Sequence, residues 1–226
     1  MKKAVAERRT CLQVCVAILE YADNTERQLR QKLAERGFPP EEIDAAVTTV
    51  KAKRLFSEQN YAGRYALLCA KKNWGPRRIL LSMREKGFRE ENISAVDAAM
   101  KAAMTGAAGG RSPDAPGAFS AIGENAGAQI REEISRIDNS DIENLLYSLD
   151  FISSCAILIR AAIHQQRYRR LRTWYEEGEL PEGREARMAL QKERQRLYAA
   201  LFRRGFDMGT IRDAEDVVRE NPADEE

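Results

Sequence analysis

Cations and aromatic residues are interspersed between positions 51 and 78 of this 226-residue chain. The cations are Lys51, Lys53, Arg54, Arg64, Lys71, Lys72, Arg77 and Arg78, and Glu58 is the only acidic residue among them. The interleaved aromatic residues are Phe56, Tyr61, Tyr65 and Trp74. This mixture suits contact with phosphates or with an acidic groove of a protein, because cations neutralise the charge and rings offer flat apolar surface.

A second cluster comprises Arg167, Arg169, Arg170 and Arg172, with Tyr168 and Trp174 beside them. For both clusters the alternative interpretation is a solvated helix face whose aromatic residues turn inward. Taken together, the clusters favour a binding surface. The chain as a whole is only weakly basic, since 37 Lys and Arg against 35 Asp and Glu leave a net charge of +2. Any binding of a polyanion must therefore depend on local clusters.

Residues suited to catalysis are scarce in this sequence. Its one histidine, His164, falls within an expected helix, where a single histidine is more often structural. Adjacent glutamates occur at 41–42, 90–91, 132–133 and 176–177, mostly near expected helix starts or turns, where they favour the helix dipole and solubility. The sequence offers no nucleophile, acid–base pair or set of metal ligands. We therefore expect no enzymatic activity, no metal and no cofactor.

The cysteines and apolar runs indicate the compartment. Cys11, Cys15, Cys69 and Cys155 lie on apolar helical stretches without a CxxC pair, which predicts buried thiols in a reducing compartment. The basic N-terminus leads into an amphipathic helix rather than a signal-peptide cleavage site. The later apolar run 151–163 is too short to cross a bilayer. We expect a cytoplasmic monomer that makes no membrane contact.

The elements that position these side chains are predicted from three cation-Gly-Phe triplets, at 36–38, 86–88 and 204–206. Aligning the glycines places apolar residues eight and four positions before each one, and six and thirteen positions after it. These residues are Leu29, Leu33, Ile43 and Val50, then Ile79, Met83, Ile93 and Met100, then Leu197, Leu201, Ile211 and Val218. The spacing predicts a pair of amphipathic helices around each triplet.

Each triplet is interpreted as a helix stop. The glycine adopts the left-handed conformation just past the helix, the cation lies at the negative end of the dipole, and the phenylalanine contacts the apolar residue five positions earlier. The predicted structural helix stops are Gly37, Phe38, Gly87, Phe88, Gly205 and Phe206. Upstream helices are predicted at about 11–22 and about 58–72, so the repeating unit has three helices.

Four segments follow from this pattern. We predict a first three-helix repeat at 1–54 and a second at 55–104, then a flexible Gly-, Ala- and Pro-rich linker at 105–123. Segment 124–226 contains a helical insertion, with helical stretches at about 124–137 and 141–177, and the third three-helix repeat. The predicted fold is all-α, with tandem three-helix repeats in an elongated, curved array that offers a long binding face rather than a deep pocket.

The repeats resemble those of the RecX family, bacterial regulators of the RecA recombinase. The resemblance rests on AILEYADNTERQLRQKLAERGFPPEEIDAAV in the first repeat, on LFSEQNYAGRYA and WGPRRILLSMREKGFREENISAV in the second, and on KERQRLYAALFRRGFDMGTI in the third. The segment between about 105 and 180 is longer than the family usually shows. Whether it completes the third repeat or forms a separate element is left open.

The resemblance implies a protein without a cofactor that lies in the groove of RecA filaments on single-stranded DNA. There we expect it to modulate ATP turnover and strand exchange, in homologous recombination, DNA repair and the SOS response; inhibition is the expected direction, and stimulation is left open. Cations matching the family's repeats are the expected contacts with RecA or DNA: Arg27, Arg30, Lys32, Arg36, Arg77, Arg78, Arg84, Lys86, Arg203 and Arg204. From the basic clusters we add Lys71, Lys72, Arg167, Arg169 and Arg170.

Two other classes of function remain open at this point. The first is a helical-repeat nucleic-acid-binding protein that acts without RecA, through weak and salt-sensitive contacts with single- or double-stranded DNA. The second is a protein-interaction scaffold that shares only the helical repeat. Charge reversal at Arg77 and Arg78 distinguishes the scaffold, since its binding depends on apolar surface rather than on cations.

Overall fold

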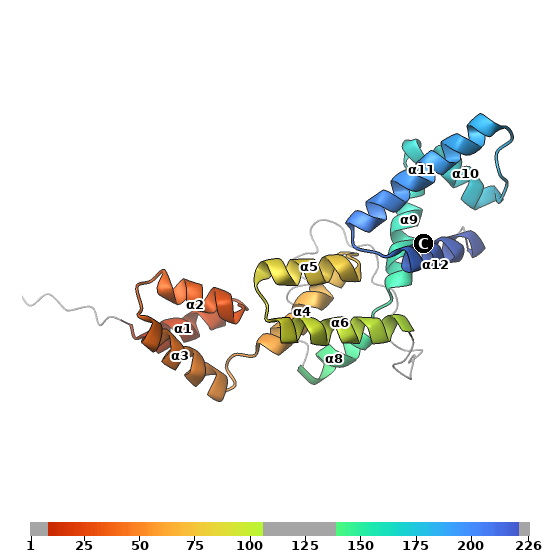
Figure 1. Cartoon of the computed structure of the whole chain (residues 1–226). Coiled ribbons are helices and arrows are strands. Elements are labelled where there is room, and N and C mark those ends of the chain that lie inside the picture. The colour runs from red at the N-terminus through yellow and green to blue at the C-terminus, as the bar shows by residue number, and fades with distance from the viewer. Residues whose placement is uncertain (1–8, 106–138, 222–226) are drawn as a thin grey trace, which may run out of the picture.

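The computed structural model describes residues 9–105 and 139–221, and every regular element in these ranges is a helix (Figure 1). The first unit contains α1 (Cys11–Tyr21), α2 (Glu26–Ala34) and α3 (Pro40–Ala52). The second contains α4 (Glu58–Ala70), α5 (Pro76–Lys86) and α6 (Glu90–Thr105). The expected linker and the expected helix at about 124–137 lie outside the described residues, apart from Thr105.

Local sequence explains where the first helices begin. Thr10 and Thr25 each form a capping box, with Gln13 and Gln28 respectively, and so satisfy backbone N–H groups that have no partner within α1 and α2. Two prolines, Pro39 and Pro40, start α3, where a missing N–H costs nothing. These three helices enclose a small apolar core of their own.

One glycine turn follows each of α2, α5 and α11 (Arg184–Arg203). Gly37, Gly87 and Gly205 have φ angles of 82°, 86° and 93°, in the left-handed region that favours glycine. The following phenylalanine N–H donates to the carbonyl five residues earlier, at 3.4 Å in the first turn, 3.1 Å in the second and 3.3 Å in the third. This is the bond of a Schellman ending, which satisfies carbonyl groups at the helix end.

A fourth helix, α8 (Asn139–Tyr147), packs against α4 and α6 of the second unit. Small residues on α4 allow this approach: a Cβ atom on Gly63 would overlap the side chain of Ile142. Ile142 and Leu146 of α8 are buried in the same apolar cluster as Ala62 and Ala66 of α4. The insertion therefore contributes a helix to the second unit.

The third unit takes its first helix from the same insertion. α9 (Phe151–Ile163) packs against α12 (Met208–Glu220) and α11 (Arg184–Arg203), while a 3₁₀ turn (Gln166–Tyr168) and α10 (Arg169–Glu177) lie between them in the chain. The helical stretch predicted at about 141–177 thus consists of three helices and a 3₁₀ turn. The break before α9 follows from Asp150, whose carboxylate caps the new helix by accepting from the Ser153 N–H at 2.9 Å.

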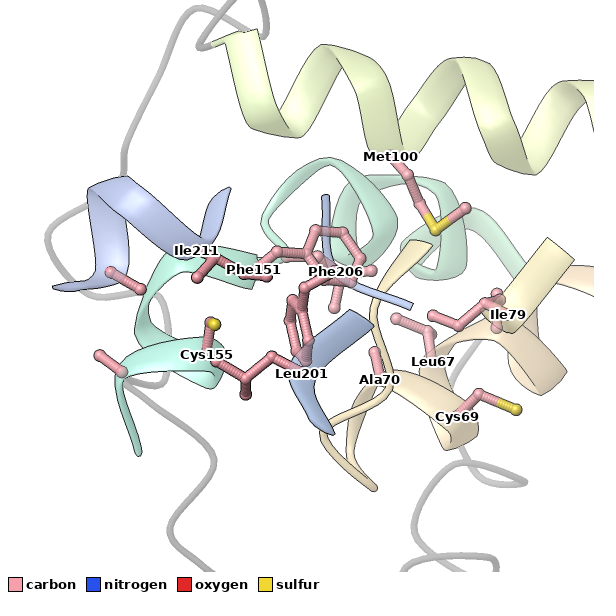
Figure 2. Packing of buried hydrophobic residues seen from close by; sticks show 14 of the residues in the cluster. Leu67, Cys69, Ala70, Ile79, Met100, Phe151, Cys155, Leu201, Phe206 and Ile211 are labelled. Atoms are coloured by element: carbon pink, nitrogen blue, oxygen red, sulfur yellow. The ribbon is translucent and has the colours of Figure 1, made fainter. Parts of the chain in front are cut away.

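The apolar core is divided unequally along the molecule. The second and third units share one continuous cluster, and Phe206 lies in it among residues of α4, α5, α9 and α11 (Figure 2). The first unit has a separate cluster. Consecutive units follow one another along an elongated molecule (Figure 1). Among the described residues, no helix is both long and apolar enough to cross a membrane.

Candidate partner-binding surface

The second and third units meet through backbone hydrogen bonds. The N–H of Gly75 donates to the carbonyl of Arg204 at 2.7 Å, and the N–H of Arg77 donates to the carbonyl of Gly205 at 3.2 Å. Cβ atoms on Gly75 and Gly205 would overlap the backbone of the opposite segment, so this approach requires both glycines. The carbonyl groups at the end of α11 thus cap the start of α5.

This contact brings together six predicted partner-binding residues. We call the group the basic joint: Lys71, Lys72, Arg77, Arg78, Arg203 and Arg204. Within the described part of the chain, the side chains of Lys72, Arg77, Arg203 and Arg204 form no ion pair or hydrogen bond, and all four are exposed. Arg77 and Arg78 also lie in the first turn of α5, at the positive end of its dipole, where cations are unfavourable. Helix stability therefore does not explain their position.

Aromatic rings accompany the cations, but most of each ring faces inward. The Arg78 guanidinium lies 4.1 Å from the centre of the Trp74 ring, and the Lys86 ammonium lies 5.0 Å from that of Tyr65. Both rings pack against the apolar core, while Phe56 and Tyr61 are buried. The cations thus cover the rings and form the surface themselves, with energies of about 0.5–1 kcal/mol per exposed pair.

Buried Cys69 does not neutralise these cations. Burial raises the pKa of its thiol to about 11, although a hydrogen bond from Tyr65 and the charges of Lys72, Lys86 and Arg78 act in the opposite direction. The thiol is therefore uncharged near neutral pH. It brings no negative charge to the basic joint.

Cations at the junction of the first and second units are paired instead. Glu26 is only 5% exposed and binds Lys51 at 2.6 Å, Arg89 at 2.6 Å and Arg30 at 3.1 Å. Burial alone would raise the pKa of Glu26, but hydrogen bonds from Lys51 and Arg30 and the charges of Lys51 and Arg89 hold this pKa below its ordinary value. Arg64 pairs with Asp23 at 3.0 Å across the same junction.

Other predicted cations of the first two units have local roles. Lys32 donates to the Asn24 amide oxygen at 2.5 Å, and Arg36 donates to the Lys32 carbonyl at 2.6 Å. Arg84 pairs with Glu90 at 3.0 Å on the exposed surface. Arg27 lies at the first junction, where its side chain passes over the Gly87 turn. The structure does not bring these four residues into the basic joint.

The arginines before and within α10 form a separate group. Arg167 stacks on Tyr168 at 4.9 Å, and Arg170 pairs with Glu193 at 3.2 Å. Glu193 also accepts from the N–H groups of Arg170 and Leu171 at 3.1 Å each and so caps α10. Because Glu193 precedes Arg203 by ten residues of α11, roughly 15 Å along the helix, Arg167, Arg169 and Arg170 lie away from the basic joint.

Sequence reasoning missed the buried glutamates and two exposed apolar residues near the cations. Glu26, Glu58, Glu193 and Glu215 occupy positions in register with core residues, which could have identified them as buried. Glu58 accepts from the N–H groups of Glu26 at 3.3 Å and Arg89 at 2.9 Å and so bridges two units. Leu81 of α5 and Phe202 of α11 are 55% and 39% exposed, and lie on the same helices as the cations.

Comparison with known proteins supports the repeat assignment. Residues 11–48 match the RecX first three-helix domain, and residues 183–214 match the RecX third three-helix domain. These ranges cover most of α1–α3 and then α11 with half of α12, on either side of the second unit. No solved structure matches the chain.

Individual relatives carry the same family name. The chain is 33% identical over 89 residues to a "Regulatory protein RecX" of Pseudomonas savastanoi, covering 39% of this chain and 55% of that protein. It is 36% identical over 77 residues to one of Vibrio cholerae, covering 34% of this chain and 51% of that protein. The chain thus spans about half the length of the curated relatives it matches. The matched first and third domains, in the expected order, support assignment of this chain to the RecX family.

Proposed function

We propose that the protein regulates a RecA-type recombinase by binding its filament on single-stranded DNA and lowering ATP turnover and strand exchange. The observation that carries this proposal is the ordered pair of RecX domain matches at the two ends of one helical array. An elongated array suits a polymeric partner, because each unit can contact a successive subunit. This function needs no catalytic group, and its site is the cytoplasm, where DNA is repaired and recombined.

The basic joint is the proposed contact with the filament. Where the second and third units meet, it presents exposed cations, of which Arg77 and Arg203 have no ion pair among the described residues. An acidic protein groove and a DNA backbone both complement such a surface. Leu81 and Phe202 supply exposed apolar area on the helices that form the joint, which favours a protein surface as part of the contact.

The test measures RecA ATPase activity and strand exchange on single-stranded DNA with increasing amounts of the protein. We expect inhibition by the wild-type chain, and a loss of about tenfold in potency for Arg77→Glu, because this exposed side chain has no ion pair or hydrogen bond with any described residue. Lys192→Glu is the matched control: its charge change is identical, and it lies on α11 away from the joint. Unchanged ATPase and strand exchange at stoichiometric excess of wild type would refute the proposal.

A second candidate is binding of nucleic acid without RecA, which the exposed cations of the basic joint favour. Release of counterions from DNA makes such binding fall steeply with salt. Titration of fluorescent single- and double-stranded DNA across salt concentrations separates the two functions. Tight, salt-sensitive binding to bare DNA, together with no effect on RecA, would support this candidate over the first.

A further inference from the structure

The turn between α10 and α11 presents acidic and apolar side chains at the N-terminal end of α11. Four glutamates against two arginines give residues 177–188 a net charge of −2. These glutamates are exposed and form no ion pair or hydrogen bond with any described residue. Leu180 and Met188 are 59% and 61% exposed in the same stretch. We call the following residues the acidic tip: Glu177, Glu179, Leu180, Glu182, Glu185 and Met188.

The acidic tip is held against the first turn of α11. The Arg187 guanidinium donates to the carbonyl of Pro181 at 3.2 Å, which keeps Leu180 beside the start of this helix. A hollow of about 420 Å³ opens next to Met188. It is lined by Gly183, Arg184, Arg187, Met188 and Gln191. The acidic tip therefore combines negative charge, apolar surface and room for a side chain of a partner.

The basic joint complements the acidic tip in charge and in apolar surface. Leu81 lies one turn after Arg77 on α5, and Phe202 directly precedes Arg203 on α11. Both apolar side chains are exposed, at 55% and 39%. Opposite charges steer two such surfaces together, and the apolar side chains add contact area once they meet. The other exposed large apolar side chains of the described residues are separated in the chain: Tyr21, Leu55 and Met104.

One molecule cannot bring its own acidic tip to its own basic joint. The tip lies at the N-terminal end of α11, whereas Arg203 and Arg204 lie at the C-terminal end, against the start of α5 (Figure 1). α11 has 20 residues, so about 30 Å of helix separates the two surfaces. Because a helix cannot fold back on itself, a contact between tip and joint must join two copies.

We propose that the basic joint of one molecule binds the acidic tip of a second copy of this chain. Two different surfaces meet in this contact, so each bound pair leaves one joint and one tip free, and further copies can add at either end. Exposed charges contribute modestly, so we expect association at about 0.1 mM and a monomer in dilute solution. An occupied joint is closed to a recombinase filament, and only this consequence rests on the proposed function.

Sedimentation velocity of the full chain at increasing concentration tests the contact with no recombinase present. We expect the average sedimentation coefficient to rise up to about 1 mM protein in about 0.05 M salt. It should stay constant in about 0.5 M salt, which screens exposed charges. Because the recombinase is absent, failure here leaves the proposed function standing, and failure of the ATPase assay leaves this contact standing.

Two double variants each lack the charge of one surface. Arg77→Gln with Arg203→Gln neutralises the basic joint, and Glu179→Gln with Glu182→Gln neutralises the acidic tip. Each alone should weaken self-association by about tenfold. An equimolar mixture should associate into pairs and no further, because the first variant keeps an intact tip and the second an intact joint. This mixture shows that both variants are folded and that the two surfaces meet.

Glu41→Gln with Glu42→Gln is the matched control, since it removes the same charge from exposed positions of the first unit. It should associate like wild type. A constant sedimentation coefficient of wild type up to about 1 mM in low salt would overturn the proposal, and so would a mixture of the two double variants that stays monomeric. Equal weakening by the control would overturn it as well, because net charge alone would then govern association. Absent association, together with oligonucleotide binding that needs Arg77 and Arg203, would assign the joint to nucleic acid instead.

Discussion

At the scale of single residues, the cations divide into those paired with a carboxylate and those that are not. Arg30, Arg84 and Arg170 have acidic partners, while Arg77 and Arg203 have none among the described residues. The sequence could predict that cations cluster, but it could not separate these groups. Arg170 and its partner Glu193 are 23 positions apart, so only the fold brings them together. Mutations at paired cations test stability, and mutations in the basic joint test binding.

The three glycine turns differ in what a methyl group would meet, so they should differ in tolerance to alanine. Gly37→Ala introduces only the strain of a side chain in the left-handed conformation, and should lower the free energy of unfolding by about 1–2 kcal/mol. Gly205→Ala must also displace the start of α5, and should lower the free energy of unfolding by at least about 3 kcal/mol. Urea denaturation measures both. Equal losses would show that the junction between the second and third units does not depend on close approach.

Protonation of Glu26 should lower the stability of the protein at acidic pH. Its pKa in the folded state is below the ordinary value of 4.5, so its contribution is complete above that value and is lost as pH falls towards the folded pKa. The urea midpoint of wild type should therefore fall more steeply between about pH 5 and pH 3 than that of Glu26→Gln. Exposed Glu41→Gln is the control, and parallel profiles for wild type and Glu26→Gln would contradict the assignment.

At the scale of elements, the helices flanking each triplet could be predicted, whereas the insertion could be predicted as helical but its division into α8, α9 and α10 could not. Residues near each glycine carry caps, breakers and apolar spacing within a few positions, so local chemistry defines α2, α3, α5 and α6. The positions of α8 and α10 depend on distant groups instead. α8 needs the gap at Gly63, and α10 is capped by Glu193 from another helix.

Docking of α8 can be tested through Gly63. A Gly63→Val variant should displace α8, since even a Cβ at this position overlaps Ile142. Hydrogen exchange of the α8 amides should then rise while α1–α3 stay protected. Adding Ile142→Ala should restore part of the protection, because it removes the overlapping atoms. Unchanged exchange in α8 would mean that α4 and α8 do not pack closely.

At the scale of the whole molecule, the two junctions differ in chemistry. The first rests on ion pairs and polar caps, including Arg89–Glu26 and Arg64–Asp23, while the second lies within a continuous apolar core. Salt screens exposed charges but leaves apolar burial largely intact. The first unit should consequently behave as a separate folding unit.

Hydrogen exchange at low and high salt measures this difference. Amides of α1–α3 should open at a lower free energy than those of α4–α6 and α9–α12, and about 1 M salt should widen the gap. Arg89→Gln should have the same effect at low salt, and Arg84→Gln, which breaks a pair within the second unit, should not. A single cooperative opening under every condition would contradict a divided core.

The central claim is that this array binds a recombinase filament through the basic joint. Equilibrium binding of the labelled chain to RecA filaments on single-stranded DNA, compared with the same DNA alone, tests it most directly. The account predicts tighter binding to the filament than to bare DNA, and weakening of about tenfold or more by Arg77→Glu and Arg203→Glu but not by Lys192→Glu. Equal affinity for the filament and for bare DNA would contradict the account, and so would a filament affinity that neither Arg77→Glu nor Arg203→Glu changes.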